Sequence, residues 1–197
     1  MTEAYGAAGP EVPAGAAAAA AGVWPRWRPV HRPFGPRQQF TAGRRAASAA
    51  LAAAGAADRI VPRDPGGRPR FPRGFAGSIS HTDRLAVAVV VPGAAAVGVD
   101  IESAVISPRA TAFVLSGQER LKLLPPAGKY TPRELFAAKE AAFKALSGTG
   151  SLGDFLFWRI ELHPADGALT ASYRGVPVTV WINSEEDLSL ALAISPG

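Results

Sequence analysis

The chain has 197 residues and a net charge of +5, with 21 Lys and Arg side chains against 16 Asp and Glu. It contains no cysteine, which excludes a disulfide framework and thiol chemistry, and no apolar run is long enough to span a membrane. We therefore expect a soluble, monomeric, cytoplasmic protein of one domain or two small halves. Its basic surface favours an anionic partner: a nucleic acid, a phosphorylated cofactor or an acidic protein.

The first 22 residues are expected to be disordered or only locally helical, because they are mostly Ala, Gly, Pro and Glu without a periodic apolar pattern. Residues 23–34 carry Trp24, Trp27, three prolines and several cations, which indicates an extended segment. Two interpretations stay open for it. It is either a strap packed over the core or a surface that stacks on single-stranded nucleic acid.

An arginine-rich region comes next. Residues 41–54 are rich in alanine and stop before Gly55, so we expect a helix with Arg44 and Arg45 in or near its first turn. Cations at that end oppose the helix dipole, and a bound phosphate would offset the repulsion. Residues 60–72 are expected to form a turn-rich loop. The loop carries three further arginines: Arg63, Arg68 and Arg70.

Residues 77–82 read Gly-Ser-Ile-Ser-His-Thr and precede a predicted strand over residues 85–91. Both faces of that strand are apolar, which is typical of a strand buried on both sides. Ser80 and His81 then lie at a strand margin. Hydroxyl and imidazole groups that follow an arginine loop fit an anion-binding pocket.

The alternation of side chains over residues 96–102 predicts a strand with two different faces. Val97, Val99 and Ile101 point one way, and Gly98, Asp100 and Glu102 point the other. Two carboxylates on one face repel each other, so this face is either a solvent-exposed edge or a site for a hard cation such as Mg²⁺. A third carboxylate, Glu140, could complete such a site.

Two capping boxes mark the starts of helices in the second half of the chain. Ser116 and Glu119 stand at capping-box spacing and head a short helix that two prolines end. Thr131 and Glu134 stand at the same spacing and head a longer helix over residues 131–146.

The longer helix carries Lys139, Glu140 and Lys144. Glu140 and Lys144 are four residues apart, so they share a helical face with Phe136. Such a pair is usually an ordinary solvated ion pair, and the upstream carboxylate strand is what favours a functional role. Three further strands, at residues 155–162, 176–182 and 188–194, are expected to close an antiparallel sheet.

Residues 98–102 (Gly-Val-Asp-Ile-Glu), followed by residues 139–144 (Lys-Glu-Ala-Ala-Phe-Lys), resemble the motifs of the 4′-phosphopantetheinyl transferases. Residues 77–82 resemble a third signature of that family. Gly43-Arg44 and residues 67–72 (Gly-Arg-Pro-Arg-Phe-Pro) are similar to the enterobactin-synthetase-component-D-like branch of the Sfp-type enzymes, of actinobacterial type. Each motif alone is weak, whereas four motifs in register are specific.

The resemblance covers residues 34–160 and implies an α+β fold with the site in a crevice between two pseudo-symmetric halves. Each half would be a small antiparallel sheet packed on a helix. Residues 23–96 would form the N-terminal half, which binds the phosphates of coenzyme A. Residues 97–197 would form the C-terminal half, which binds Mg²⁺ and carries out catalysis, and residues 1–22 would be a disordered segment.

The implied activity is transfer of the 4′-phosphopantetheine arm from coenzyme A to a serine of an acyl or peptidyl carrier protein. The products are the holo-carrier protein and adenosine 3′,5′-bisphosphate. Glu140, or a water held by the metal, would take the serine proton, and Lys144 would neutralise the leaving group. The implied metal ligands are Asp100, the backbone carbonyl of Ile101, Glu102 and Glu140. The implied contacts of coenzyme A are Arg37, Arg44, Arg63, Arg68, Ser80, His81, Asp100 and Lys144.

Three features qualify the resemblance. Glu119 stands where the family has a glutamate sometimes proposed as the base, although its capping position already accounts for it. Phe136 replaces a tryptophan that usually precedes the first lysine of the motif, and we expect the replacement to be tolerated. Residues 103–130 mix apolar side chains with Arg120 and Lys122 and are a candidate docking surface for an acidic carrier protein.

Two other classes of protein fit parts of the chain. A basic nucleic-acid-binding protein would use residues 24–45 and would not need the carboxylates to converge. A Mg²⁺-dependent phosphohydrolase would use the same carboxylates on a different phosphate ester. We favour the transferase, without a nucleic-acid or membrane partner, because only that class explains the four motifs together.

Overall fold

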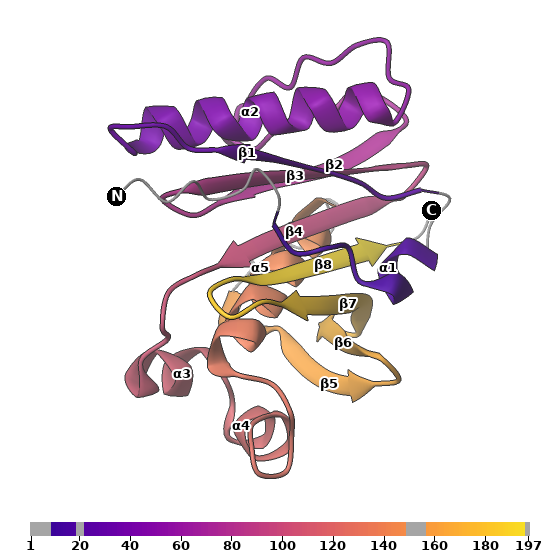
Figure 1. The fold of residues 1–197 in the computed structure, drawn as a ribbon. Coiled ribbons are helices and arrows are strands. Elements are labelled where there is room, and N and C mark those ends of the chain that lie inside the picture. Colours follow the sequence, from indigo (N-terminus) through magenta and orange to yellow (C-terminus); the bar gives the residue numbers. More distant parts are fainter. Residues whose placement is uncertain (1–8, 19–21, 149–156, 196–197) are drawn as a thin grey trace.

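The computed structural model describes residues 9–18, 22–148 and 157–195, which form two antiparallel sheets with one long helix against each (Figure 1). The strand order is β1-β3-β2 in the first sheet and β4-β8-β7-β6-β5 in the second. The α+β class and the two halves of sheet and helix are therefore confirmed. No helix in the described part of the chain is long and apolar enough to cross a membrane.

The strands of the first sheet are β1 (Trp24–Pro29), β2 (Phe75–His81) and β3 (Leu85–Pro92). Those of the second are β4 (Ala96–Glu102), β5 (Glu161–Ala165), β6 (Ala168–Tyr173), β7 (Val176–Ser184) and β8 (Ser189–Ser195). The described helices are α1 (Ala14–Ala18), α2 (Pro36–Ala53), α3 (Pro108–Val114), α4 (Gly117–Leu123) and α5 (Pro132–Gly148), with a 3₁₀ turn, η1 (Phe157–Arg159), before β5.

Helix α2 packs on the first sheet through small side chains. Strand β3 is buried on both faces, as predicted, and its Ala88 and Val90 lie in one core cluster with the alanines of α2. Gly43 marks the closest approach, because a Cβ atom there would lie 2.8 Å from Cγ2 of Ile79 on β2. Small residues on α2 thus let the helix lie directly on the sheet.

Helix α5 packs on the second sheet in the same way, with a buried stripe that is mainly alanine. Gly98 of β4 meets this stripe, since a Cβ atom at Gly98 would lie 1.8 Å from the carbonyl oxygen of Ala141. Only glycine permits this approach. It brings β4 and α5 close enough for the side chains of Asp100 and Lys144 to meet.

The two halves join along β2 and β4, which lie next to each other at the edges of their sheets. A shared apolar core between the sheets includes Val87, Val99 and Leu192. No backbone ladder joins β2 to β4 within the described chain, and the backbone N–H of Ile101 donates instead to Oγ of Ser80 at 3.4 Å. We call this junction of β2 and β4 the seam.

Strand β1 shows how most of residues 23–34 pack, whereas the nucleic-acid interpretation of this segment stays untested. It pairs antiparallel with β3 at the edge of the first sheet, with Trp27 opposite Val87, and Trp27 packs against the shared core. Pro25 and Pro29 are compatible with this position, because the outer side of an edge strand needs no N–H donor. The segment is therefore part of the sheet, as the strap interpretation required.

Residues 1–22 were expected to be disordered or only locally helical, and in residues 9–18 the short helix α1 agrees with the second alternative. Ala16 of α1 is fully buried in the shared core, and Asn183 Nδ2 donates to the carbonyl oxygen of Glu11 at 3.0 Å. This part of the segment is ordered, with one short helix, because its small apolar side chains cover the second sheet. Residues 1–8 and 19–21 lie outside the described residues.

Helix α2 begins at Pro36 instead of residue 41. Proline suits the first turn of a helix, where its missing N–H is not needed. Arg44 and Arg45 consequently lie in the middle of α2, and the prediction that they oppose the helix dipole in the first turn is wrong. The start of α5 is confirmed, because Thr131 N donates to Glu134 Oε2 at 2.7 Å and Glu134 N donates to Thr131 Oγ1 at 3.3 Å.

The strand predicted over residues 155–162 is wrong at its start. The aromatic ring of Phe157 packs against Phe136 and Phe143 of α5, with centroid distances of 5.7 and 6.2 Å, and this contact favours a turn at η1. The strand begins only at Glu161, and residues 155–156 lie outside the described residues. Strand β6 was not predicted, although Gly167 and Gly175, both with positive φ, mark the turns on either side of it.

Candidate active site

Three elements meet at one carboxylate of the seam. Asp100 Oδ1 accepts hydrogen bonds from Ser80 Oγ at 2.7 Å and from Lys144 Nζ at 2.6 Å. Lys144 Nζ also donates to the carbonyl oxygen of Val99 at 2.9 Å. The side chain of Asp100 is almost fully buried, so these charged and polar contacts are only weakly screened by water. β2, β4 and α5 are therefore held together at the place that the motifs predicted.

Glu140 lies one turn before Lys144 on α5. Partial burial raises the pKa of Glu140, and the nearby charges of Asp100 and Glu102 raise it further, while Lys144 opposes them. The raised pKa means that burial and the neighbouring carboxylates together disfavour the charged form of Glu140 more than Lys144 stabilises it. Such a place favours either a proton or a bound cation.

The predicted cluster of three metal-binding carboxylates is not formed as such. In the part of the chain that the structure describes, no three acidic or histidine side chains lie together as a metal-binding group. Asp100 Oδ1 is engaged by Ser80 and Lys144, and Glu102 Oε1 accepts from the backbone N–H of Ala104 at 2.7 Å. Metal binding by Asp100, Glu102 and Glu140 together therefore stays a prediction.

The carboxylate and carbonyl oxygens near Glu140 are nevertheless ligands of the type that Mg²⁺ prefers. Mg²⁺ is usually held by one or two carboxylates together with phosphate oxygens and waters, and does not need a full protein cage. Glu140 has neighbouring carboxylates that raise its pKa, which a divalent cation would relieve. The carbonyl of Ile101 lies on the same strand edge as that of Val99, which Lys144 already contacts, because residues two apart on a strand share an edge.

A second cluster lies around Phe40 of α2. The guanidinium carbons of Arg44 and Arg63 lie 4.8 and 4.6 Å from the centre of the Phe40 ring. Burial lowers the pKa of Arg44, and the charge of Arg63 lowers it further. Arg44 Nε is also a buried donor without a hydrogen-bond partner in the described structure. Two close cations and an unsatisfied donor indicate an anion-binding site.

A cavity of about 500 Å³ runs along the seam, with walls from β2, the loop before it, the start of β4 and the end of α5. Arg68 and Lys144 both line this cavity. Asp64 holds Arg68 in place through a contact of 2.9 Å between Nε and Oδ2, and Arg68 Nη1 donates to the carbonyl oxygen of Ser147 at 3.4 Å. The arginine loop is thereby fastened to the other half of the molecule.

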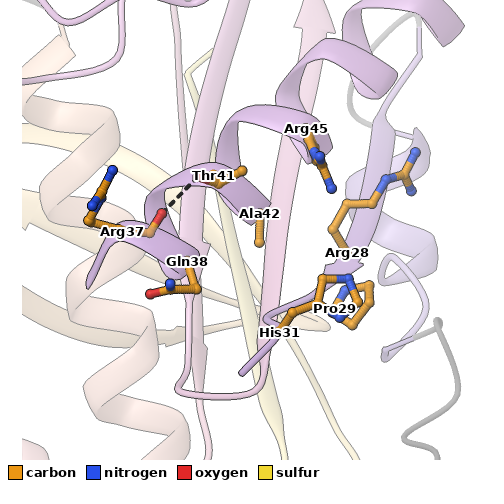
Figure 2. A pocket seen from close by; sticks show the side chains of 8 residues that line it. All are labelled: Arg28, Pro29, His31, Arg37, Gln38, Thr41, Ala42 and Arg45. Atoms are coloured by element: carbon orange, nitrogen blue, oxygen red, sulfur yellow. Dashed lines mark hydrogen bonds between the residues drawn. The ribbon is translucent and has the colours of Figure 1, made fainter. Parts of the chain in front are cut away.

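His81 and Arg37 have different surroundings. His81 ends β2, next to Ser80; partial burial lowers its pKa, Lys144 lowers it further, and Asp100 opposes them. It is thus close to the carboxylate of the seam. Arg37 instead lines another cavity, between α2 and β1 (Figure 2). The structure does not bring Arg37 into the cavity along the seam.

Comparisons with known protein families agree with this arrangement. The family model described as the 4′-phosphopantetheinyl transferase N-terminal domain matches residues 36–91. The model described as the 4′-phosphopantetheinyl transferase superfamily matches residues 96–194, which is half of the chain and contains the carboxylate strand and α5. The chain belongs to the 4′-phosphopantetheinyl transferase superfamily. No curated protein was found to match it.

In this transferase Glu119 is a buried structural residue. Its Oε1 accepts from the backbone N–H of Leu162 at 2.9 Å and its Oε2 from that of Ser116 at 2.7 Å. Lys139 Nζ, which is fully buried, lies 2.9 Å from the same carboxylate. The capping box is confirmed, and Glu119 additionally ties α4 to α5 and β5. The sequence offered no signal for its pairing with Lys139.

The region between β4 and α5 carries several exposed apolar side chains, which we call the exposed apolar patch: Val105, Phe113 and Leu121. Phe113 is 69% exposed, and its ring centroid lies 5.8 Å from that of Trp158. Val105 and Leu121 are 94% and 67% exposed. Arg120 was predicted to be a docking cation, but its Nη1 donates to the carbonyl oxygens of Ala112 and Leu115 at 3.2 and 3.1 Å. Arg120 therefore holds α3 against α4.

Proposed function

We propose that this phosphopantetheinyl transferase takes the 4′-phosphopantetheine arm from coenzyme A and attaches it to a serine of acyl or peptidyl carrier proteins. We further propose that it is an Sfp-type enzyme of the enterobactin-synthetase-component-D-like branch. The single observation that carries this proposal is the set of contacts around Asp100, which joins Ser80 and Lys144 at the seam beside Glu140, a carboxyl whose pKa is raised by burial and by Asp100 and Glu102.

Coenzyme A is proposed to lie along the seam with its diphosphate next to Lys144. The adenosine phosphates would contact cations on the N-terminal side, where Arg44 has an unsatisfied buried donor and Arg68 lines the cavity. Arginine suits this task because its planar guanidinium donates two hydrogen bonds to a phosphate at once. Arg63, Ser80 and His81 complete the proposed contacts, and Arg37 would take part only at the periphery.

Mg²⁺, held by Glu140 with Asp100, Glu102 or the carbonyl of Ile101, would supply charge neutralisation at the diphosphate. The serine Oγ forms a bond to the phosphorus that carries pantetheine. The bond from that phosphorus to the bridging oxygen breaks, and its electron pair leaves on adenosine 3′,5′-bisphosphate.

The chain's own residues position this reaction. Glu140 is proposed to accept the proton of the serine hydroxyl, either directly or through a water. Lys144 neutralises the charge that develops on the leaving bisphosphate. Asp100 holds the ammonium of Lys144 in place through their contact of 2.6 Å.

The test is the mass of an apo carrier protein incubated with the full chain, coenzyme A and Mg²⁺. Addition of one phosphopantetheine arm per carrier is the expected result. A carrier protein whose presented serine is replaced by alanine is the control and should stay unmodified. Unmodified wild-type carriers from acyl and peptidyl systems alike would refute the proposed substrate. Release of inorganic phosphate or free pantetheine phosphate without carrier modification would point to a phosphohydrolase instead.

A further inference from the structure

A second cavity, of about 460 Å³, lies between the edge strand β1 and helix α2 (Figure 2). Its polar lining consists of Arg28 and His31 from the β1 side and of Arg37, Gln38, Thr41 and Arg45 from α2. The volume falls in the range of about 300–1,000 Å³ that is usual for sites of small molecules. Neither Arg28 nor Arg45 is among the residues proposed above to contact coenzyme A.

The backbone explains why Arg28 and Arg45 face one cavity (Figure 2). Arg28 stands opposite Ala86 in the β1–β3 ladder, and Ala86 shares a small core cluster with Ala42 of α2. Arg28 therefore lies on the helix side of the sheet. On α2, residues 37, 41 and 45 are spaced four apart and form one stripe of the helix surface. The stripe borders the strand, so cations from two elements line the same space.

The cavity has an excess of positive charge. Its lining contains three arginines and no acidic residue, and none of these arginines forms an ion pair with a carboxylate of the described chain. Arg28 Nη1 donates to the carbonyl oxygen of Trp27 at 2.7 Å, which leaves the rest of its guanidinium group available. Like charges held together in this way are relieved by an anion with more than one charge.

The cavity is separate from the seam. It shares no lining residue with the cavity along β2 and β4. In the first sheet, β3 lies between β1, which carries Arg28, and β2, which carries Ser80. Arg44, next to Arg45 in the sequence, is directed to the cluster of Phe40 and Arg63 instead. An anion bound near Arg28 and Arg45 would therefore not contact the carboxylate of Asp100.

We propose that the cavity between β1 and α2 is a second anion site, which takes a phosphate-bearing small molecule of nucleotide size in addition to the coenzyme A proposed for the seam. The guanidinium groups bind the phosphate oxygens, and Thr41 and Gln38 offer polar contacts to the remainder of the ligand. The site goes beyond the proposed transfer reaction, because neither Arg28 nor Arg45 has a part in that reaction.

The test is calorimetric titration of the full chain with inorganic diphosphate, without Mg²⁺ and with the seam saturated by coenzyme A. One equivalent of diphosphate should bind. Arg45→Gln changes an exposed helix residue and should weaken binding about tenfold, and Arg28→Gln/Arg45→Gln about a hundredfold, because each arginine supplies charge-assisted hydrogen bonds. Arg26→Gln removes a charge from the same strand outside the cavity and is the matched control, with less than about a threefold effect expected.

Four outcomes would overturn the proposal. Coenzyme A could abolish diphosphate binding, which would place the anion at the seam. Weak binding that Arg45→Gln leaves unchanged would mean an adventitious ion only. Complete absence of binding to the wild-type chain would exclude the site. A single-stranded oligonucleotide that binds more tightly than diphosphate, and is lost in the same variants, would mean a nucleic-acid groove. Carrier modification should be unchanged in Arg28→Gln/Arg45→Gln, so failure here is distinguishable from failure of the proposed transfer.

Discussion

Lys144 Nζ lies 2.6 Å from Asp100 Oδ1, across the contact that Gly98 opens between β4 and α5. The Lys144 side chain is partly exposed, whereas the Asp100 side chain is almost fully buried. The buried carboxylate thus holds the ammonium group of Lys144 at the seam. Ser80 of the other half donates to the same carboxylate oxygen at 2.7 Å. One buried side chain thus couples the two halves at the proposed site.

The first prediction concerns that anchor. Asp100→Asn keeps the shape of the side chain but removes its charge, so Lys144 loses its partner and the proposed metal site loses a ligand. Carrier modification should fall at least about a hundredfold, as expected when a preorganised electrostatic contact is lost. The measurement is the rate of holo-carrier formation by mass spectrometry. Wild-type turnover that persists in excess EDTA would end the assignment of Mg²⁺.

The second prediction is a pH dependence of stability that originates at Glu140. Its pKa is raised above the ordinary value of 4.5 in the folded protein. The folded state therefore binds the proton of Glu140 more tightly than the unfolded state does. The stability that this proton contributes is fully present below pH 4.5 and is lost as pH rises through the raised pKa. Glu140→Gln should remove this loss and give a higher Tm than wild type at neutral pH in the absence of divalent cations.

The control for this prediction is the metal itself. Added Mg²⁺ should raise the Tm of wild type at neutral pH and leave that of Glu140→Gln nearly unchanged, because the variant offers no carboxylate at this position. Carrier modification by Glu140→Gln should be strongly reduced at every pH. Identical Tm curves for wild type and variant from pH 4 to 8 would contradict the raised pKa of Glu140.

The third prediction separates a structural from a catalytic role of Glu119. Glu119→Gln leaves the buried ammonium of Lys139 without a counter-charge and should cost about 3–5 kcal/mol of stability. Urea unfolding measures this loss. Glu119→Leu/Lys139→Met removes both charges and should be clearly less destabilising than the single change. If the folded fraction of Glu119→Gln had no transfer activity at any pH, Glu119 would act in the chemistry.

The fourth prediction concerns the 3′-phosphate of coenzyme A. Dephospho-coenzyme A should bind more weakly, by about 1.5–3 kcal/mol for each charge-assisted hydrogen bond that it lacks. His81→Ala should reduce the difference between the two ligands, and Arg44→Gln should reduce it as well. Calorimetric titration of each variant with both ligands is the measurement. Equal affinities of the wild-type chain for the two ligands would remove His81 and Arg44 from the site.

The fifth prediction places carrier-protein docking on the exposed apolar patch. Leu121→Ser with Lys122→Glu should raise the KM for carrier protein and leave the KM for coenzyme A nearly unchanged, because both side chains are exposed and their helix α4 lies away from β2 and β4 (Figure 1). Lys129→Glu reverses a charge in the same region and is the comparison for charge alone. Arg120 is avoided because its change would release α3. Unchanged constants at low ionic strength would place docking elsewhere.

The sequence alone determined the local elements that carry strong signals. Capping boxes at Ser116 and Thr131 predicted the starts of two helices, because a cap depends on residues only three positions apart. Alternation predicted β4 and the face that carries Asp100. Boundaries without such signals were missed: α2 starts five residues earlier than predicted, and β6 was not recognised at all.

The tertiary structure decided which of the predicted residues act together. Ser80, Asp100 and Lys144 are distant in the sequence and meet only because Gly98 admits α5 against β4 and because β2 lies next to β4. Arg37 lines the cavity between α2 and β1, and the carboxylate of Glu119 is paired with Lys139. These outcomes depend on long-range packing and burial, which periodicity and spacing do not encode. The protonation and the partners of a charged side chain depend on the groups that the fold places beside it, and these groups are distant in the sequence.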